Sequence, residues 1–145
     1  MFRGNHPARV DEKGRLKVPA AFKRELEELS EMKVFITSRD GKRAEIYPMS
    51  RWEKIEEEMK GKASSEAKEH FQDATSYYGQ EAEIDSQGRI LIPQHLREDA
   101  TLTGDVAVLG LQRFLAVVNN EMHRAKLQQN PVTPAVMDAL KLTEI

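Results

Sequence analysis

Two Gly-Arg pairs, Gly14-Arg15 and Gly88-Arg89, are the residues of this sequence best suited to bind another molecule. A glycine lets the backbone come close to a partner, and an arginine directly after it presents a planar set of N–H donors. That set matches the O6 and N7 atoms of guanine, or the oxygens of a phosphate group. In the alternative interpretation, each arginine only caps the end of a hairpin or pairs with a neighbouring aspartate. The residue types alone leave both interpretations open.

The charge around the two arginines differs. Residues 1–24 contain seven Lys and Arg against two carboxylates, whereas residues 81–99 contain two arginines against five carboxylates. Lys13, Lys17 and Arg9 surround Arg15 in the sequence, so a polyanion should meet the first pair more readily than the second. The overall net charge of -2 argues against a uniformly basic coat for nucleic acid.

The two pairs belong to a gapless repeat, in which residues 8–19 return as residues 82–93 with identical Ala, Asp, Gly, Arg and Pro. A repeat of this length predicts a duplicated structural unit whose copies bury each other's apolar faces. At 145 residues the chain is long enough for one shared core, and two independent cores are not expected.

Each copy should form a strand, a tight turn at the glycine, and a second strand that ends at a proline. Pro19 and Pro93 end these strands and suit the start of a helix, where a backbone N–H has no partner. Asp11 and Asp85 lie where a short carboxylate accepts hydrogen bonds from turn amides, so we expect them to be structural. The apolar run Ile90-Leu91-Ile92 predicts a strand that is covered on both faces.

The remaining pattern predicts helices, hairpins and a tail. Ser50-Arg51-Trp52-Glu53 has the pattern of a capping box, with Ser50 as the cap of a helix that Gly61 closes. The tail from Gln128 is either an ordered strap on a neighbouring molecule or a frayed end. The other expected elements are a helix after Pro19, a connecting helix over 64–78, and strands over 34–37, 44–47, 106–109 and 114–118.

Catalytic and metal-binding patterns are missing from the sequence. There is no cysteine, and the four histidines are dispersed with no pair at helical spacing, so no metal or cofactor is expected. The acidic run Glu56-Glu57-Glu58 would point in different directions on a helix. No nucleophile has an evident base, and no glycine-rich phosphate loop is present, so we predict a protein that is not an enzyme. No segment resembles a signal peptide or a membrane span, which predicts a soluble cytoplasmic protein.

The chain resembles the MraZ family, within the wider SpoVT-AbrB class of DNA-binding proteins. The resemblance lies in the opening Met1-Phe2-Arg3-Gly4, the first motif from Asp11 to Pro19, the segment Tyr47-Pro48 to Trp52, and the second motif from Asp85 to Pro93. These pieces follow the family's order and cover most of the chain up to about His123. The chain departs from a close internal copy at Gln87, where a lysine would match Lys13.

This resemblance implies an α+β fold, in which two tandem swapped-hairpin β-elements of AbrB type form an intramolecular pseudo-dimeric β-barrel with flanking helices. The implied domains are residues 5–50 and 79–122, joined by a helical connector over 51–78 and followed by a C-terminal helix or tail over 123–145. Chains of this family are expected to associate into rings, for example an octamer or a dodecamer.

The resemblance also implies a transcriptional repressor located at the bacterial nucleoid. Its target would be short G-rich direct repeats in the promoter of the division and cell-wall gene cluster. No small-molecule substrate and no membrane partner are expected. The residues assigned to DNA contact are Arg15, Lys13, Gly14, Arg9, Arg3, Arg89 and Gly88, with Asp11, Asp85, Pro19 and Pro93 shaping the turns.

Two other functions remain to be distinguished from this one. The chain could be a non-enzymatic, oligomeric interaction protein whose basic edge binds an acidic protein partner. It could also be an antitoxin of the same β-hairpin class, although such a protein normally carries a disordered toxin-binding tail. Steep salt dependence and preference for one DNA sequence would favour the DNA-binding interpretation.

Overall fold

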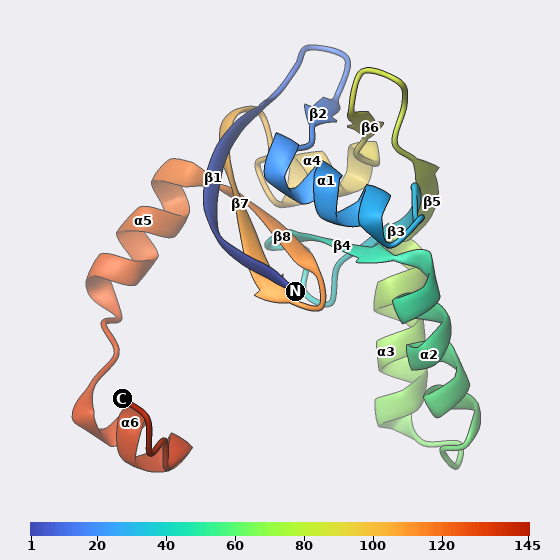
Figure 1. The fold of residues 1–145 in the computed structure, drawn as a ribbon. Coiled ribbons are helices and arrows are strands. Elements are labelled where there is room, and N and C mark those ends of the chain that lie inside the picture. Colours follow the sequence, from blue (N-terminus) through green and yellow to red (C-terminus); the bar gives the residue numbers. More distant parts are fainter.

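A single sheet of eight antiparallel strands organises the chain, and six helices flank it (Figure 1). The computed structural model describes residues 1–145. The strands are β1 (Phe2–Val10), β2 (Arg15–Lys17), β3 (Lys33–Thr37), β4 (Ala44–Pro48), β5 (Gln80–Glu83), β6 (Arg89–Leu91), β7 (Gly104–Gln112) and β8 (Leu115–Asn119). The helices are α1 (Ala20–Glu28), α2 (Met49–Lys60), α3 (Glu66–Tyr77), α4 (Gln94–Asp99), α5 (Asn120–Gln129) and α6 (Pro134–Leu140).

The strand order shows that the two halves interlock. The order is β5-β3-β4-β8-β7-β1-β2-β6, so β1 pairs with β7, β3 with β5, β2 with β6 and β4 with β8. These four pairings stay the same when β1, β2, β3 and β4 are exchanged with β5, β6, β7 and β8 in turn. The terminal strands β5 and β6 are joined by the second glycine turn, which nearly closes the sheet into a barrel. The expected internal pseudo-dimer is therefore confirmed.

One core serves both halves. Twenty buried apolar residues form a single cluster, to which both repeats contribute their strand residues. Leu16 lies opposite Ile90 where β2 meets β6, and both side chains are buried. After the strands, α1 buries Phe22 and Leu26, and the shorter α4 buries Leu96. One sheet and one core therefore carry both copies. The expected domain boundaries, at residues 5–50 and 79–122, stay a prediction.

The helices begin where the sequence supplies a cap or a proline. Pro19 and Pro93 precede the first residues of α1 and α4 with almost the same backbone angles, φ -53° and -54°. The Ser65 hydroxyl accepts a hydrogen bond from the Lys68 amide at the start of α3, 3.1 Å long. The Asn119 side chain does the same for the Met122 amide at the start of α5, at 3.0 Å.

A helical hairpin and a helical arm extend from the barrel in different directions (Figure 1). Helices α2 and α3 lie side by side and are joined to the sheet by stacked aromatic rings. The Trp52 ring centroid lies 4.6 Å from that of Phe35 and 6.4 Å from that of Phe71. Helices α5 and α6 form the arm, and neither contains a buried residue.

Two local expectations were wrong. Leu91 is 51% exposed, because β6 has one buried face and only Ile90 and Ile92 point into the core. Ser50 is not the cap of α2, which begins at Met49 directly after Pro48. The amide of Ser50 donates instead to a carboxylate oxygen of Glu31, at 2.7 Å, so a distant side chain satisfies this helix end.

Candidate nucleic-acid interface

The first glycine turn is fixed by hydrogen bonds around Asp11. The Gly14 amide donates to the Asp11 carbonyl and the Asp11 amide to the Arg15 carbonyl, each at 2.9 Å. One carboxylate oxygen of Asp11 also accepts from the amides of Lys13 and Arg15, at 3.0 and 2.9 Å. Gly14 has a φ of +84°, a conformation that a side chain would strain. The bond from the Arg15 amide, followed by the bond from its side chain, lowers the pKa of Asp11.

The second turn repeats this geometry. One carboxylate oxygen of Asp85 accepts from the amides of Gln87 and Arg89, at 2.8 and 2.9 Å. Gly88 has a φ of +78° and donates its amide to the Asp85 carbonyl at 2.9 Å. The hydrogen bond from the Arg89 amide is the main reason that the pKa of Asp85 is lowered. The identical Asp, Gly and Arg residues therefore produce one turn twice.

Both arginines pair with the aspartate of their own turn and still keep free donors. The Arg15 Nε lies 2.9 Å from Asp11 Oδ2 in a hydrogen bond. The corresponding Nε of Arg89 is 3.5 Å from Asp85 Oδ2 and makes no hydrogen bond. The terminal guanidinium nitrogens of Arg15 bond to nothing else in the chain, and its side chain is 32% exposed. The aspartate thus orients a guanidinium whose outer edge can bind another molecule.

The interlocked strands bring the two turns together at one end of the barrel (Figure 1). The Val18 amide donates to the Gly88 carbonyl at 2.8 Å, and the Ile92 amide donates to the Gly14 carbonyl at 3.0 Å. In the register of β2 and β6, Lys17 lies opposite Arg89. The two turns, whose glycines are 74 positions apart in the sequence, therefore form one continuous surface.

A shallow hollow of about 730 Å³ lies beside the first turn. It is lined by two carboxylates, Asp11 and Glu12, and by six cations that come from both halves of the sequence. These cations are Arg9, Lys13, Arg15, Lys17, Arg89 and Arg97. An excess of positive charge in a concave surface attracts polyanions and increases their rate of association.

Arg97 is the member of this surface that the sequence analysis missed. It comes from α4 in the second half, and its Nε donates to the Ile92 carbonyl at 3.0 Å. Its guanidinium fills the space beside Gly14 that any Cβ at that position would enter. Lys23 of α1 occupies the equivalent place beside Gly88. Lys23 and Arg97 occupy equivalent positions, 74 residues apart, in the two copies of the repeat. Each copy's helix therefore places a cation beside the glycine turn of the other copy, and an interlocked topology would have predicted this exchange.

Other expected contact residues lie further from the turn. Arg9 lines the hollow, and its Nη1 also forms an exposed ion pair with Asp105, at 2.9 Å. Arg3 pairs with Leu111 near the opposite end of β1. Arg9 lies six positions after Arg3 along β1, a distance of roughly 20 Å. The structure therefore does not bring Arg3 to the turns.

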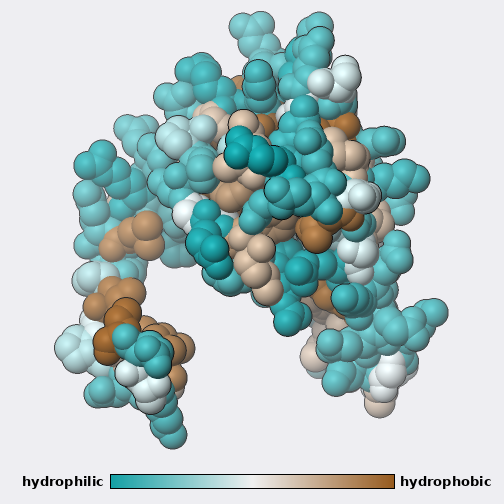
Figure 2. All heavy atoms as spheres, in the orientation of Figure 1, coloured by the Kyte–Doolittle hydropathy of each residue, from teal (hydrophilic) through white to brown (hydrophobic).

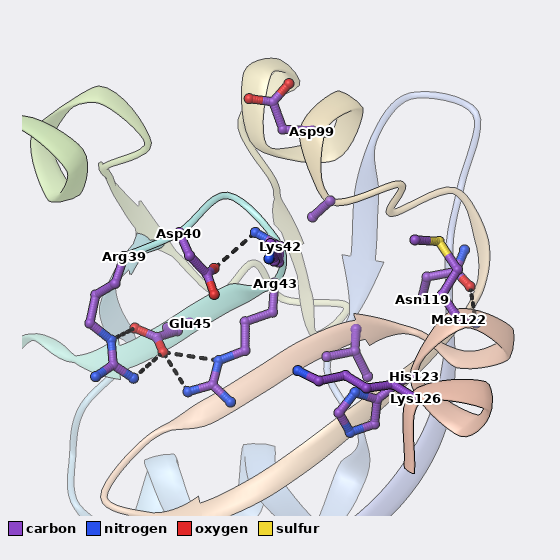
Figure 3. A pocket seen from close by; sticks show the side chains of 12 residues that line it. Arg39, Asp40, Lys42, Arg43, Glu45, Asp99, Asn119, Met122, His123 and Lys126 are labelled. Carbon is purple, nitrogen blue, oxygen red and sulfur yellow. Dashed lines mark hydrogen bonds and ion pairs between the residues drawn. The ribbon is translucent and has the colours of Figure 1, made fainter. Parts of the chain in front are cut away.

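A second hollow, of about 610 Å³, contains a buried ion cluster instead (Figure 3). Glu45 is 1% exposed and is held by Arg39 and Arg43, each 2.7 Å from Oε2, and by the Tyr47 hydroxyl at 3.2 Å. Burial is the main cause that raises the pKa of Tyr47, with Glu45 adding to it. Because the Glu45 carboxylate is saturated with donors, this cluster is a structural support at the start of β4.

The structure contains no cluster of three or more His, Asp or Glu side chains that could hold a metal ion. None of its helices has both the length and the apolar character needed to cross a lipid bilayer.

The fold and the paired turns define a class: a duplicated swapped-hairpin barrel with two Gly-Arg turns at one end. The family model described as "MraZ protein, putative antitoxin-like" matches residues 1–74 and 79–134. The chain belongs to the MraZ family. It is 52% identical over 141 residues to the transcriptional regulator MraZ of Acidobacterium capsulatum, with 97% of each chain covered.

Two further relatives carry the same name. The transcriptional regulator MraZ of Koribacter versatilis is 45% identical over 135 residues, with 92% of each chain covered. That of Syntrophobacter fumaroxidans is 40% identical over 130 residues, covering 88% of this chain and 85% of the relative.

Proposed function

We propose that this protein is a transcriptional regulator that binds double-stranded DNA through the end of the barrel where the two glycine turns meet. The observation that carries this proposal is the position of Arg15, whose free guanidinium edge lies in a hollow lined by six cations. The names of the relatives, which are transcriptional regulators, support the same function.

In this proposal Arg15 reads guanine. Asp11 holds the Nε side of the guanidinium, so the terminal nitrogens are oriented before DNA arrives. They can donate two parallel hydrogen bonds to guanine O6 and N7 in the major groove. Lys13, Lys17 and Arg97 would contact the flanking phosphates, which fixes the position of the turn on the duplex. Arg89, next to Lys17, is the secondary contact.

The finer assignment is also a proposal. We propose repression of the bacterial division and cell-wall gene cluster from short G-rich direct repeats in its promoter, at the nucleoid in the cytoplasm. A few cations per chain give only modest, salt-dependent affinity, so the working form would be a ring that places several turns on one DNA molecule. A head-to-tail ring presents its turns in one direction, which suits direct repeats better than palindromes.

The test compares Arg15→Ala with Arg3→Ala. Fluorescence anisotropy would measure binding to the promoter fragment of the bacterium's own division cluster and to a scrambled duplex. Loss of one bidentate contact, worth ~1–3 kcal/mol, should weaken specific binding about 5- to 150-fold for Arg15→Ala. Arg3→Ala removes the same type of side chain from β1 and should change the affinity by less than about twofold, because Arg3 is remote from the turns.

Two results would overturn the proposal. Unchanged specific affinity of a folded Arg15→Ala protein would remove Arg15 from the interface. Weak binding of the wild type that does not depend on DNA sequence would instead favour an acidic protein partner for the basic hollow.

A further inference from the structure

The hollow beside Glu45 contains more positive charge than its internal ion pairs neutralise. Four of its lining residues are permanently cationic: Arg39, Lys42, Arg43 and Lys126. The two arginines share the single carboxylate of Glu45. Lys42 and Lys126 form no ion pair within the chain. The Glu45 hollow is therefore a concave surface with unpaired cations.

The carboxylates of the Glu45 hollow are already engaged. Glu45 itself is saturated by its arginines and Tyr47. Asp99 accepts a hydrogen bond of 2.6 Å from a hydroxyl outside the hollow, and Figure 3 shows its carboxylate apart from the cations. Asp40 Oδ1 accepts from the Lys42 amide at 2.9 Å. None of these carboxylates neutralises the two lysines.

Three nitrogen-bearing side chains, those of Arg43, His123 and Lys126, converge on one side of this hollow (Figure 3). Arg43 holds Glu45 through Nε and Nη2, at 3.1 and 2.7 Å, which leaves its Nη1 free. His123 and Lys126 are three positions apart on α5 and so lie on one face of the helix. Burial, followed by the charges of Lys126 and Arg43, lowers the pKa of His123. Both charges that act on this histidine are therefore positive.

The Glu45 hollow also has an apolar wall and the size of a small-molecule site. Ala100, Val118 and Met122 line it together with the cations. Its volume of about 610 Å³ lies within the range of roughly 300–1,000 Å³ that is typical of such sites. The Arg43 guanidinium lies 5.7 Å from the centre of the Phe114 ring, which helps to fix its position. An apolar wall beside convergent donors suits a molecule with an anionic end and an organic body.

This hollow is separate from the surface proposed for DNA. No residue lines both the Glu45 hollow and the basic hollow at the turns. It also differs from the rest of the helical arm. Figure 2 shows apolar residues gathered on the arm, away from the barrel, whereas the start of α5 contacts β7 and β8 and places its His and Lys in the hollow.

We propose that the Glu45 hollow binds a small phosphorylated molecule, namely a phosphomonoester with an uncharged organic body. Its phosphate oxygens accept hydrogen bonds from Arg43 Nη1, Lys126 Nζ and a ring N–H of His123. Three donors from different directions match the three terminal oxygens of a phosphate better than the two oxygens of a carboxylate. The organic body lies against Val118 and Met122. This inference goes beyond the proposed function and does not depend on DNA contact.

The chemical class of the ligand can be tested with three small probes. Isothermal titration calorimetry of the full-length protein in a chloride buffer near neutral pH would compare phenyl phosphate, inorganic phosphate and benzoate. Phenyl phosphate should bind about tenfold more tightly than inorganic phosphate, because its ring covers the apolar wall. Benzoate should bind at least about tenfold more weakly than phenyl phosphate, because it has one charge and two oxygens. Equal affinity for benzoate, or no binding of phenyl phosphate at millimolar concentration, would overturn the proposal.

Two variants on the same helix test the location of the site. Lys126→Gln should weaken binding of phenyl phosphate about tenfold, through loss of a hydrogen bond to a charged group. Arg124→Gln is the matched control, since Arg124 is exposed on α5 but does not line the hollow, and it should change the affinity by less than about twofold. Asp40→Asn should strengthen binding about threefold by removing a like charge. Equal losses in the two α5 variants would show general attraction to charge and would overturn the site.

Nuclear magnetic resonance of the histidine rings gives a readout that a merely structural role of Lys126 would not change. A bound dianion favours the charged imidazole, so phenyl phosphate should raise the pKa of His123 in the wild type. The other three histidines, His6, His70 and His95, do not line the hollow and are internal controls. Binding without a selective change at His123 would place the ligand elsewhere. Circular dichroism checks that every variant is folded.

Duplex DNA is the other source of phosphate groups, and a competition experiment separates the two. Lys126→Gln should bind the promoter duplex within about twofold of the wild type, and the duplex should not displace phenyl phosphate. Displacement together with weaker DNA binding by Lys126→Gln would place a DNA phosphate in the hollow and would overturn the small-molecule site. Unchanged DNA affinity of Arg15→Ala, which overturns the proposed function, would leave the results with phenyl phosphate as they are.

Discussion

The two glycine turns have the same backbone and different surfaces. Gly14 and Gly88 are both buried with positive φ, and each turn closes with the same set of hydrogen bonds to its aspartate. The exposed positions around them differ in charge: Arg9, Lys13 and Lys17 in the first copy correspond to Glu83, Gln87 and Leu91 in the second. The repeated residues therefore build the turn, and the residues that changed decide whether it attracts a polyanion.

This difference indicates that the two copies have different roles. Buried residues must be kept in both halves, because each half completes the core and the turn of the other. Exposed residues are free of that constraint, so one copy can become basic while the other supplies structure. The second copy still contributes to the first turn through Arg97, which makes the basic hollow a product of both halves.

The glycines offer the largest test of this comparison. Gly14→Ala and Gly88→Ala should each cost ~1–2 kcal/mol of unfolding free energy, because a side chain is strained at positive φ. Gly14→Ala should cost about 1 kcal/mol more, since the new Cβ displaces Arg97 from its hydrogen bond to Ile92. At Gly88 the nearest atom is Lys23 Cδ, 3.4 Å away, which is ordinary contact. Urea denaturation followed by circular dichroism measures both.

A double-mutant cycle identifies the cause of that difference. In an Arg97→Ala background, the extra cost of Gly14→Ala over Gly88→Ala should disappear. If it persists, the crowding beside Gly14 comes from something other than the Arg97 side chain.

Converting the second turn into the first tests the surface directly. Glu83→Arg/Gln87→Lys/Leu91→Lys should increase affinity for duplex DNA about tenfold at low salt, with a steeper dependence on salt concentration. Each added phosphate contact steepens the slope of log affinity against log salt by about 0.9. An unchanged slope, measured by anisotropy between low and moderate salt, would show that the second turn does not face DNA. The reverse change, Arg9→Glu/Lys13→Gln/Lys17→Leu, should weaken binding.

The sequence predicts those parts of the molecule that depend on short-range signals. The repeat, the turns at Gly14 and Gly88 and the helix starts after Pro19 and Pro93 follow from local residue types, and the structure contains them. Barrel closure and the exchange of strands follow from the resemblance to a family, because no local pattern encodes which copy a strand pairs with.

The features that the sequence analysis missed depend on distant residues. Arg97 reaches the first turn because the halves exchange helices, and its acidic sequence neighbours concealed that role. Glu31 satisfies the Ser50 amide across 19 residues, which made the local capping box misleading. Leu91 is exposed because a strand of three residues is too short for an apolar run to distinguish one covered face from two.

The smallest expected difference between the turns appears in acid. The pKa values of Asp11 and Asp85 are lowered in the folded protein, mainly by hydrogen bonds from the Arg15 and Arg89 amides. In the unfolded chain both groups titrate near pH 3.9. Their contribution to stability is therefore fully present above that pH and is lost as the pH falls through the lower folded values.

Asp11→Asn and Asp85→Asn keep an oxygen acceptor for the turn amides and remove the charge. Each should flatten the decline of unfolding free energy below pH 4, measured by urea denaturation at a series of pH values. The effect should be larger for Asp11, because its carboxylate also accepts from Arg15 Nε at 2.9 Å whereas the Arg89 contact is 3.5 Å long. Glu12→Gln is the control, since the Glu12 carboxylate makes no hydrogen bond, and its curve should follow the wild type. Equal flattening by both aspartate variants would mean that the bond to the guanidinium adds nothing to the turn, and that Arg15 is oriented by its backbone alone.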